Sequence, residues 1–204
     1  MGGKEKMGWE KSIINSEENY MEEERELKYL LPMDSFYNVV ELIKKTFPDI
    51  TTKEKFQINY YYDTDQYDLL RAGITCRVRQ SGAELLGQYK EHSVEDVHRS
   101  QENEFHLCQL PSKIEKDGRT MFFQGQLITH RKSYKISRAV KIECDVNMYL
   151  GSCDYEIEIE YSEEAYDQAK QIAAKLLLTN INLVNKYERF MKAKQLHLST
   201  VNKQ

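Results

Sequence analysis

Two glutamates and a lysine alternate in the segment Glu24-Arg25-Glu26-Leu27-Lys28, close to the start of the chain. Successive side chains of a β-strand point to opposite faces, so Glu24, Glu26 and Lys28 would share one face. Full charges are expensive to bury without partners. The segment therefore has two interpretations: a face in contact with solvent, or one wall of a wet cavity that holds a metal ion and an anion.

The same alternation of charged and apolar residues recurs along the chain. It predicts β-strands over residues 24–28, 56–63, 75–80, 86–90, 102–105, 140–146 and 155–161. Carboxylates dominate the strands of Glu24, Asp145 and Glu158, whereas cations dominate those of Arg77 and Lys90. Glutamates at every second position repel one another unless cations lie between them. A barrel with the charged faces inward would set an acidic wall against a basic wall.

These strands must be covered on their apolar faces, and helical patterns are available to do so. Amphipathic helices are predicted from Asp34 or Ser35, as the N-cap, to Phe47, from Glu163 to Leu178, and around Asn185 to Gln195. The segment from Pro111 to Thr129 contains Asp117-Gly118 and is predicted to be a connection with one short helix. We therefore expect an α+β fold: a closed antiparallel β-barrel with a charged interior, flanked by α-helices.

Length and composition limit the remaining possibilities. A chain of 204 residues suits one domain, which we place at residues 21–196 between a flexible leader (1–20) and a flexible tail (197–204). The net charge of -4 gives no reason to expect nucleic acid as a partner, and no apolar run is long enough to predict a membrane partner. Four cysteines without metal-ligand spacing favour a cytoplasmic location. The histidines (His92, His98, His106, His130 and His197) show no catalytic or metal-binding spacing and are interpreted as surface or loop residues.

Several motifs follow one another in a recognisable order. They are Glu24-x-Glu26-x-Lys28, Tyr62-Asp63-Thr64, a turn from Leu69 to Gly73, Arg77-x-Arg79, Lys90, Glu102-x-Glu104, Arg131, Asp145, the strand of Glu156, Glu158 and Glu160, and Lys186-Tyr187-Glu188-Arg189. From about Glu22 to Lys194 this set resembles the CYTH superfamily, or triphosphate tunnel metalloenzymes, which include class IV adenylate cyclases, thiamine triphosphatases and inorganic triphosphatases. The resemblance implies an eight-stranded antiparallel tunnel that binds a triphosphate and a divalent metal, Mg2+ or Mn2+.

Carried over residue by residue, the resemblance implies three sets of side chains. The phosphate-binding set is Lys28, Arg77, Arg79, Lys90, Arg131, Lys186 and Arg189, and Arg99 either joins it or lies in an exposed loop. The metal ligands are drawn from Glu24, Glu26, Asp145, Glu156, Glu158 and Glu160, where three glutamates of the last strand alternate although the motif needs two. The catalytic set is Lys28, Glu24, Glu26 and Glu158.

Three functions are compatible with such a tunnel. The leading hypothesis is metal-dependent hydrolysis of an inorganic or small organic triphosphate, which needs positioning and charge stabilisation rather than a side-chain nucleophile. The alternatives are cyclisation of ATP to cyclic AMP, for which no adenine-binding residues are identified, and a polyphosphate- or nucleotide-binding module without catalysis. The expected partner is a triphosphate-containing small molecule, and a homodimer is left open.

Overall fold

The structure of the protein is a computed structural model that describes residues 20–93 and 95–201. In chain order the elements are β1 (Tyr20–Leu31), α1 (Met33–Thr46), β2 (Thr52–Asp63), α2 (Asp68–Arg71), β3 (Ile74–Ser81), β4 (Glu84–His92), β5 (Arg99–Leu107), β6 (Lys113–Lys116), β7 (Arg119–Lys135), β8 (Val140–Tyr149), β9 (Ser152–Tyr161), the 3-10 turn η1 (Glu163–Ala165), α3 (Tyr166–Lys175) and α4 (Lys186–Val201). The predicted leader lies outside the described residues except for Tyr20, the first residue of β1.

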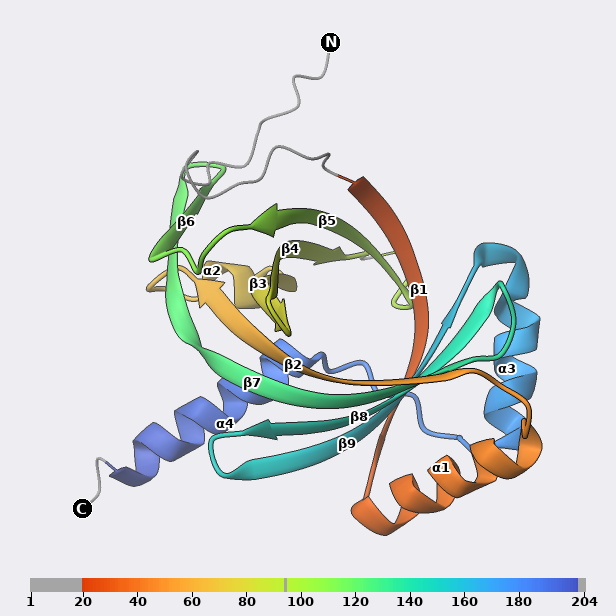
Figure 1. Ribbon diagram of the computed structural model, residues 1–204. Coiled ribbons are helices and arrows are strands. Elements are labelled where there is room, and N and C mark those ends of the chain that lie inside the picture. The colour runs from red at the N-terminus through yellow and green to blue at the C-terminus, as the bar shows by residue number, and fades with distance from the viewer. Residues whose placement is uncertain (1–19, 94, 202–204) are drawn as a thin grey trace.

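Eight strands form a closed barrel (Figure 1). They follow one another in the order β2-β3-β4-β5-β1-β9-β8-β7, and β7 pairs with β2 to complete the ring. All of these pairings are antiparallel. β6 lies outside the ring and pairs with the beginning of β7. The predicted closed antiparallel barrel with flanking helices is thus confirmed.

The barrel buries polar side chains inside and apolar side chains outside. On β9, Glu156 and Glu158 are buried within the barrel, whereas Ile157 and Ile159 belong to an apolar cluster on its outer surface. α1 and α3 contact β9 and supply Phe36 and other apolar side chains to this cluster, and Figure 1 shows both helices on the same side of the barrel. The helices therefore remove the outer apolar faces of the strands from water, which stabilises the fold.

A second apolar cluster lies under the β6–β7 hairpin, which the sequence analysis did not predict. The expectation of a connection with a short helix between Pro111 and Thr129 is wrong, because this segment forms β6 and most of β7. Asp117 (φ 52°) and Gly118 (φ 71°) both adopt left-handed backbone conformations, as a two-residue hairpin turn of this type requires. Ile114 and Met121 from the two arms are fully buried against the barrel.

Helix boundaries also differ from those predicted. α1 begins at Met33 with Pro32 as its N-cap, so neither Asp34 nor Ser35 caps it. The stretch predicted as one helix from Glu163 divides into η1 and α3. The last helix, α4, continues to Val201, and none of the described helices is long and apolar enough to cross a membrane.

The first turns of α4 pack into one end of the barrel. Tyr187, Phe190 and Met191 form a buried cluster with Tyr61 of β2 and Leu127 of β7. The close approach depends on a glycine next to a bulge between β2 and β7. A Cβ on Gly125, whose φ is 141°, would lie 2.4 Å from the Phe190 ring. No larger residue leaves room for the ring at this point.

Candidate functional site: a charged tunnel

The first wall of the tunnel comes from β1 and β4. The Nζ atom of Lys28 lies 2.7 Å from Glu26, and that of Lys90 lies 2.6 Å from Glu24 and 3.2 Å from Glu26. Burial raises the pKa of Glu26, but Lys28 and Lys90 outweigh it and hold the pKa at about 2. Both glutamates thus stay ionised among the cations, and the alternating face predicted from the sequence does line a cavity.

β3, the neighbour of β4, supplies two arginines to the tunnel. Arg77 donates to Gln88 at 2.7 Å and forms an ion pair with Glu102 at 3.3 Å. Arg79 donates only to the Asn59 amide oxygen, at 3.2 Å, and no carboxylate of the described residues lies within ion-pair distance of it. Burial, followed by Arg77 and Arg131, lowers the pKa of Arg79 to about 10. Arg79 is therefore a cation that still needs an anionic partner.

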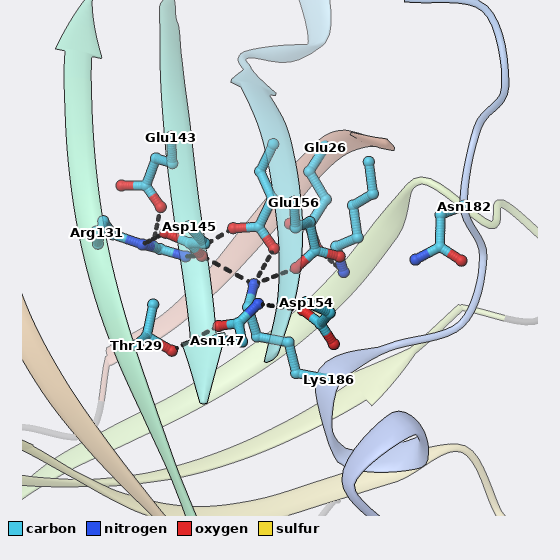
Figure 2. Close-up of polar contacts among 12 residues, drawn as sticks. Glu26, Thr129, Arg131, Glu143, Asp145, Asn147, Asp154, Glu156, Asn182 and Lys186 are labelled. Carbon is cyan, nitrogen blue, oxygen red and sulfur yellow. Dashed lines mark hydrogen bonds and ion pairs between the residues drawn. The ribbon is translucent and has the colours of Figure 1, made fainter. Parts of the chain in front are cut away.

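Arg131 of β7 is the centre of a buried ion-pair network (Figure 2). It donates to Asp145 at 2.7 and 2.5 Å and to Glu158 at 2.7 Å, and it also pairs with Glu143. The three carboxylates come from neighbouring strands whose register places Arg131 beside Asp145 and Glu143 beside Glu158. Burial would lower the pKa of Arg131, but Asp145 and Glu158 outweigh it and raise that pKa.

α4 delivers two further cations to the same acidic wall. Lys186 contacts Asp145 at 3.0 Å, Glu156 at 2.5 Å and Glu158 at 2.7 Å, and Figure 2 shows its ammonium at the meeting point of these carboxylates. Arg189 pairs with Asp154 at 2.9 Å and with Glu156 at 3.1 Å. Despite burial, the neighbouring carboxylates raise the pKa of Lys186. Because ion pairs cross the tunnel in this way, the free space left between its charged walls is only about 60 Å³.

Two groups of carboxylates are close enough together to hold a metal ion. One is Glu143, Glu158 and Glu160, the other is Asp145, Glu156 and Glu158, and in each the ligand oxygens lie within 4.8 Å of one another. Sets of carboxylate oxygens suit hard cations such as Mg2+ and Mn2+. Lys186 already forms an ion pair with each of the three carboxylates of the second group. Within residues 20–93 and 95–201, the one ion pair of Glu160 in the first group is with Lys141, at 2.7 Å, a side chain that is 40% exposed. The first group is therefore the more accessible to a metal.

The structure brings nearly all of the predicted residues together in the tunnel. They are Glu24, Glu26, Lys28, Arg77, Arg79, Lys90, Arg131, Glu158, Glu160 and Lys186 around one cavity, with Asp145 and Glu156 in direct contact with that set and Arg189 in contact with Glu156. Arg99 is the exception. It pairs with Glu23 at 2.6 Å, on the strand face opposite to Ser100 and Glu102. Arg99 therefore lies outside the tunnel, as in the second of its two interpretations.

Some tunnel residues were missed by the sequence analysis. His92, interpreted as a surface or loop residue, is the last residue of β4 and lines the cavity, so that interpretation is wrong. Burial, followed by Lys28 and Lys90, lowers its pKa to about 4. Glu143 shares the alternation of Asp145 but was not chosen as a metal ligand. The alternation itself was a sufficient signal for Glu143, and it also covers His92, which follows Lys90 by two residues and lies just beyond the predicted strand 86–90.

The model of the CYTH domain matches residues 22–191 of the chain. Among curated proteins, the chain is 25% identical over 167 residues to "Putative triphosphatase YjbK" of Bacillus subtilis (strain 168), which covers 76% of this chain and 84% of that protein.

Solved structures share the same fold. One is a putative adenylate cyclase of Bacillus halodurans, with 23% identity, a TM-score of 0.65 and coverage of 83% of this chain and 98% of that chain. Another is the putative adenylyl cyclase HpAC1 from Hippeastrum, whose description reports a dominant triphosphatase activity. It has 19% identity, a TM-score of 0.64 and coverage of 83% and 95%. At these identities the likeness extends to the barrel architecture alone.

Proposed function

This chain belongs to the CYTH domain family, and on that premise we propose that it hydrolyses a triphosphate inside its tunnel with the help of a divalent metal ion. One observation carries the proposal. Within a single cavity, an acidic group suited to a metal faces a cationic wall in which Arg79 has no carboxylate partner. A metal-bound polyphosphate presents the two complementary charges: a cation for the carboxylates and phosphate oxygens for the arginines and lysines.

The cations of the tunnel are placed to bind and orient the phosphates. Arg77 and Arg79 from β3, Arg131 from β7 and Lys186 from α4 line the same cavity, so phosphate oxygens inside it would receive donors from three elements. Guanidinium groups match phosphate oxygens in two-pronged contacts. Because Arg131 and Lys186 now contact carboxylates, the polyanion and the metal would enter together, each replacing the opposite member of an existing ion pair.

The carboxylates of Glu143, Glu158 and Glu160, with Glu24 and Glu26 on the neighbouring strand β1, would hold the metal. When bound, Mg2+ or Mn2+ neutralises charge that develops on the phosphates and on the leaving oxygen. In the proposed hydrolysis the oxygen of a water bonds to the terminal phosphorus. The bond from that phosphorus to the bridging oxygen then breaks, and diphosphate leaves with the electron pair. Positioning by Lys28, Arg77 and Arg79 supports this step without a side-chain nucleophile.

The proposal is tested by measuring released phosphate and cyclic AMP side by side. The substrates are inorganic triphosphate, thiamine triphosphate, ATP and GTP, each with Mg2+ or Mn2+. Phosphate release without cyclic AMP supports hydrolysis. Formation of cyclic AMP from ATP without phosphate release would establish cyclisation instead. Tight binding of these compounds without any turnover would establish a binding module.

A further inference from the structure

Strand β1 changes its neighbour halfway along its length, and Figure 1 shows it passing from β5 to β9. Residues 20–25 pair with β5, and residues 26–31 pair with β9. Among the residues that the structure describes, each half of β1 therefore has one edge without a neighbouring strand. A free strand edge can accept a further strand, unless the chain itself covers it.

The chain covers the free edge of the second half. The backbone N–H of Glu26 donates to the His98 carbonyl at 3.0 Å, and the Lys28 carbonyl accepts the N–H of Asn182 at 2.7 Å. Both contacts lie on the β5 side, so the even-numbered residues of β1 direct their backbone groups to that side. Successive residues of an antiparallel strand alternate in this respect, so the odd-numbered residues direct theirs to the β9 side.

The free edge of the first half is not covered in this way. The register is continuous up to Arg25, which opposes Arg99, so the same alternation holds. Met21, Glu23 and Arg25 thus direct their N–H and C=O groups to the β9 side, although β9 has ended at Tyr161. Within residues 20–93 and 95–201, no strand pairs with them there. Six residues of strand give this free edge a length of about 20 Å.

A groove of about 780 Å³ lies along the free edge. Glu23, Glu24 and Arg25 line it from β1, and the turn between β7 and β8 and the end of β9 supply the other lining residues. The groove shares Glu24 and Glu160 with the tunnel cavity. A segment bound in this groove would therefore lie directly beside the tunnel.

The unpaired charge of the groove is positive. The glutamates of its lining each have a cationic partner at 2.6 or 2.7 Å. Lys135 and Arg138, at the turn between β7 and β8, are exposed and form no ion pair with any residue of the described part of the chain. The Nε atom of Arg25 is a buried donor without an acceptor there. These groups favour a ligand that carries negative charge and hydrogen-bond acceptors.

We propose that the free edge of β1 is a docking site for an extended acidic segment of a partner protein, which adds a strand antiparallel to residues 21–25 and continues the line of β9. Such a strand begins opposite Arg25, close to the turn that carries Lys135 and Arg138, so its acidic side chains belong at its N-terminal end. The inference stands apart from the proposed hydrolysis, because it requires no ligand in the tunnel.

Other occupants match the edge less well. If two copies of this chain paired through residues 21–25 about a two-fold axis, Glu23 of one copy would oppose Glu23 of the other, and like charges directly opposite destabilise a sheet. An inorganic anion would reach Lys135 and Arg138 but would leave the backbone groups of β1 without partners. A second extended backbone matches donors and acceptors that alternate along an edge.

The test uses a synthetic acetylated peptide of about ten residues that alternates valine and threonine and begins with aspartates. One control peptide has lysines in place of the aspartates. Another has its central amides N-methylated, which removes the N–H donors from both of its edges. Fluorescence anisotropy measures binding of each peptide, and amide hydrogen exchange follows the N–H groups of β1.

We expect the acidic peptide to bind and to slow exchange at Glu23 and Arg25, whose N–H groups should exchange rapidly in the free protein. The N–H of Glu24 faces β5 and should exchange slowly with or without peptide. The lysine peptide should bind roughly tenfold more weakly, because repulsion replaces attraction at the turn. The N-methylated peptide should not bind measurably, since it cannot pair with the edge.

Two variants separate the charges from the backbone. K135Q/R138Q should weaken binding of the acidic peptide by about three- to tenfold. K44Q/K45Q is its matched control, because it removes the same charge from exposed residues in the last turn of α1. E23P removes one N–H from the free edge and should weaken binding by about fivefold. Thermal unfolding checks each variant, and if E23P does not fold, the N-methylated peptide decides the role of the backbone.

Several results would overturn the docking site. They are the absence of binding by the acidic peptide at millimolar concentration, equal binding of its N-methylated form, unchanged exchange at Glu23 and Arg25, and equal losses in K135Q/R138Q and K44Q/K45Q. Sedimentation of the wild type as a dimer that E23P dissociates would assign the edge to a second copy of the chain instead.

Discussion

The hydroxyl of Tyr187 donates a hydrogen bond of 2.8 Å to the Oδ2 atom of Asp63, and both groups are buried. The same carboxylate accepts the backbone N–H groups of Thr64, Leu69 and Leu70. A single side chain at the end of β2 therefore fixes the turn into α2 and the beginning of α4. Asp63 is thus a structural residue that holds the helix that carries Lys186 and Arg189.

Removing this hydroxyl is expected to loosen α4. Tyr187→Phe should lower the free energy of unfolding by about 1 to 3 kcal/mol, the range for a hydrogen bond to a charged acceptor. Turnover of triphosphate should fall as well, because Lys186 is adjacent in sequence. Chemical denaturation and amide hydrogen exchange of α4 measure the two effects. Tyr37→Phe on α1 is the matched control, because its side chain is 51% exposed; equal behaviour of the two variants would contradict the prediction.

Arg79 is expected to lower the free energy of unfolding and to strengthen triphosphate binding. Its folded pKa, about 10, lies below the value of 12.5 for the free side chain. The charged form is therefore disfavoured by folding at neutral pH, and this penalty begins to fall as the pH rises through 10 and is gone only above 12.5. Arg79→Met should raise the free energy of unfolding by about 1 kcal/mol or more, since it removes an uncompensated buried charge. It should also weaken triphosphate binding at least tenfold.

Arg99→Met serves as the control for that variant, because Arg99 is paired with Glu23 outside the tunnel. Urea denaturation and calorimetric titration with inorganic triphosphate give the two quantities. A variant at position 79 that loses stability, or that binds triphosphate as the wild type does, would refute the assignment of Arg79 as an anion ligand.

Two glutamates of β9 should respond differently to substitution. Glu160→Gln is expected to weaken Mn2+ binding by roughly ten- to a hundredfold with little loss of stability, because Glu160 belongs to the accessible carboxylate group. Glu156→Gln is expected to cost about 3 to 5 kcal/mol of stability, because it breaks a buried ion pair with Lys186 and Arg189. Electron paramagnetic resonance of Mn2+ and denaturant unfolding distinguish the two. The opposite ranking would place the metal beside α4.

Acid should unfold the protein partly through Glu26. Its folded pKa of about 2 lies below the ordinary value of 4.5, so ionised Glu26 stabilises the fold above pH 4.5 and that stabilisation is lost as the pH falls towards 2. Glu102 and Glu160 act in the opposite direction, because burial raises their pKa values. The difference in unfolding free energy between wild type and Glu26→Gln isolates the contribution. It should shrink by about 2 kcal/mol between pH 6 and pH 3, and a constant difference would contradict this.

Substituting the glycine beneath Phe190 should displace α4. Gly125→Ala places a methyl group 2.4 Å from the ring and imposes a φ of 141° on an L-residue. We expect a loss of about 2 to 4 kcal/mol, which combines steric overlap with backbone strain. Gly118→Ala is an informative comparison, because Gly118 also has a positive φ (71°) but nothing within 4 Å of an added Cβ. A loss at position 125 no larger than that at 118 would show that the Phe190 contact is unimportant.

The alternation of charges was enough to predict the barrel and most of its inner wall, because period-two patterning determines which side chains share a face. It could not choose among Glu156, Glu158 and Glu160, since all three share that face. Only the pairing of β8 with β9 shows that Glu158 lies beside Glu143 and Glu156 beside Asp145. The β6–β7 hairpin was missed although Asp117-Gly118 is a strong turn signal. Likewise, the part of α4 in closing the barrel depends on long-range packing onto Tyr61 that no local pattern encodes.

The packing of α4 into one end of the barrel also limits where small molecules can enter and leave the tunnel. With Tyr187 and Phe190 filling that end, the reactant and the products of the proposed hydrolysis would enter and leave at the other end, beside Glu24 and Glu160. The fragment that remains deepest then leaves last, behind whatever lies nearer the doorway. Turnover should accordingly be limited by departure of the inner fragment and inhibited when the outer one is added to the solution. A tunnel closed at one end would thereby impose on the proposed reaction an order of release that a tunnel open at both ends would not.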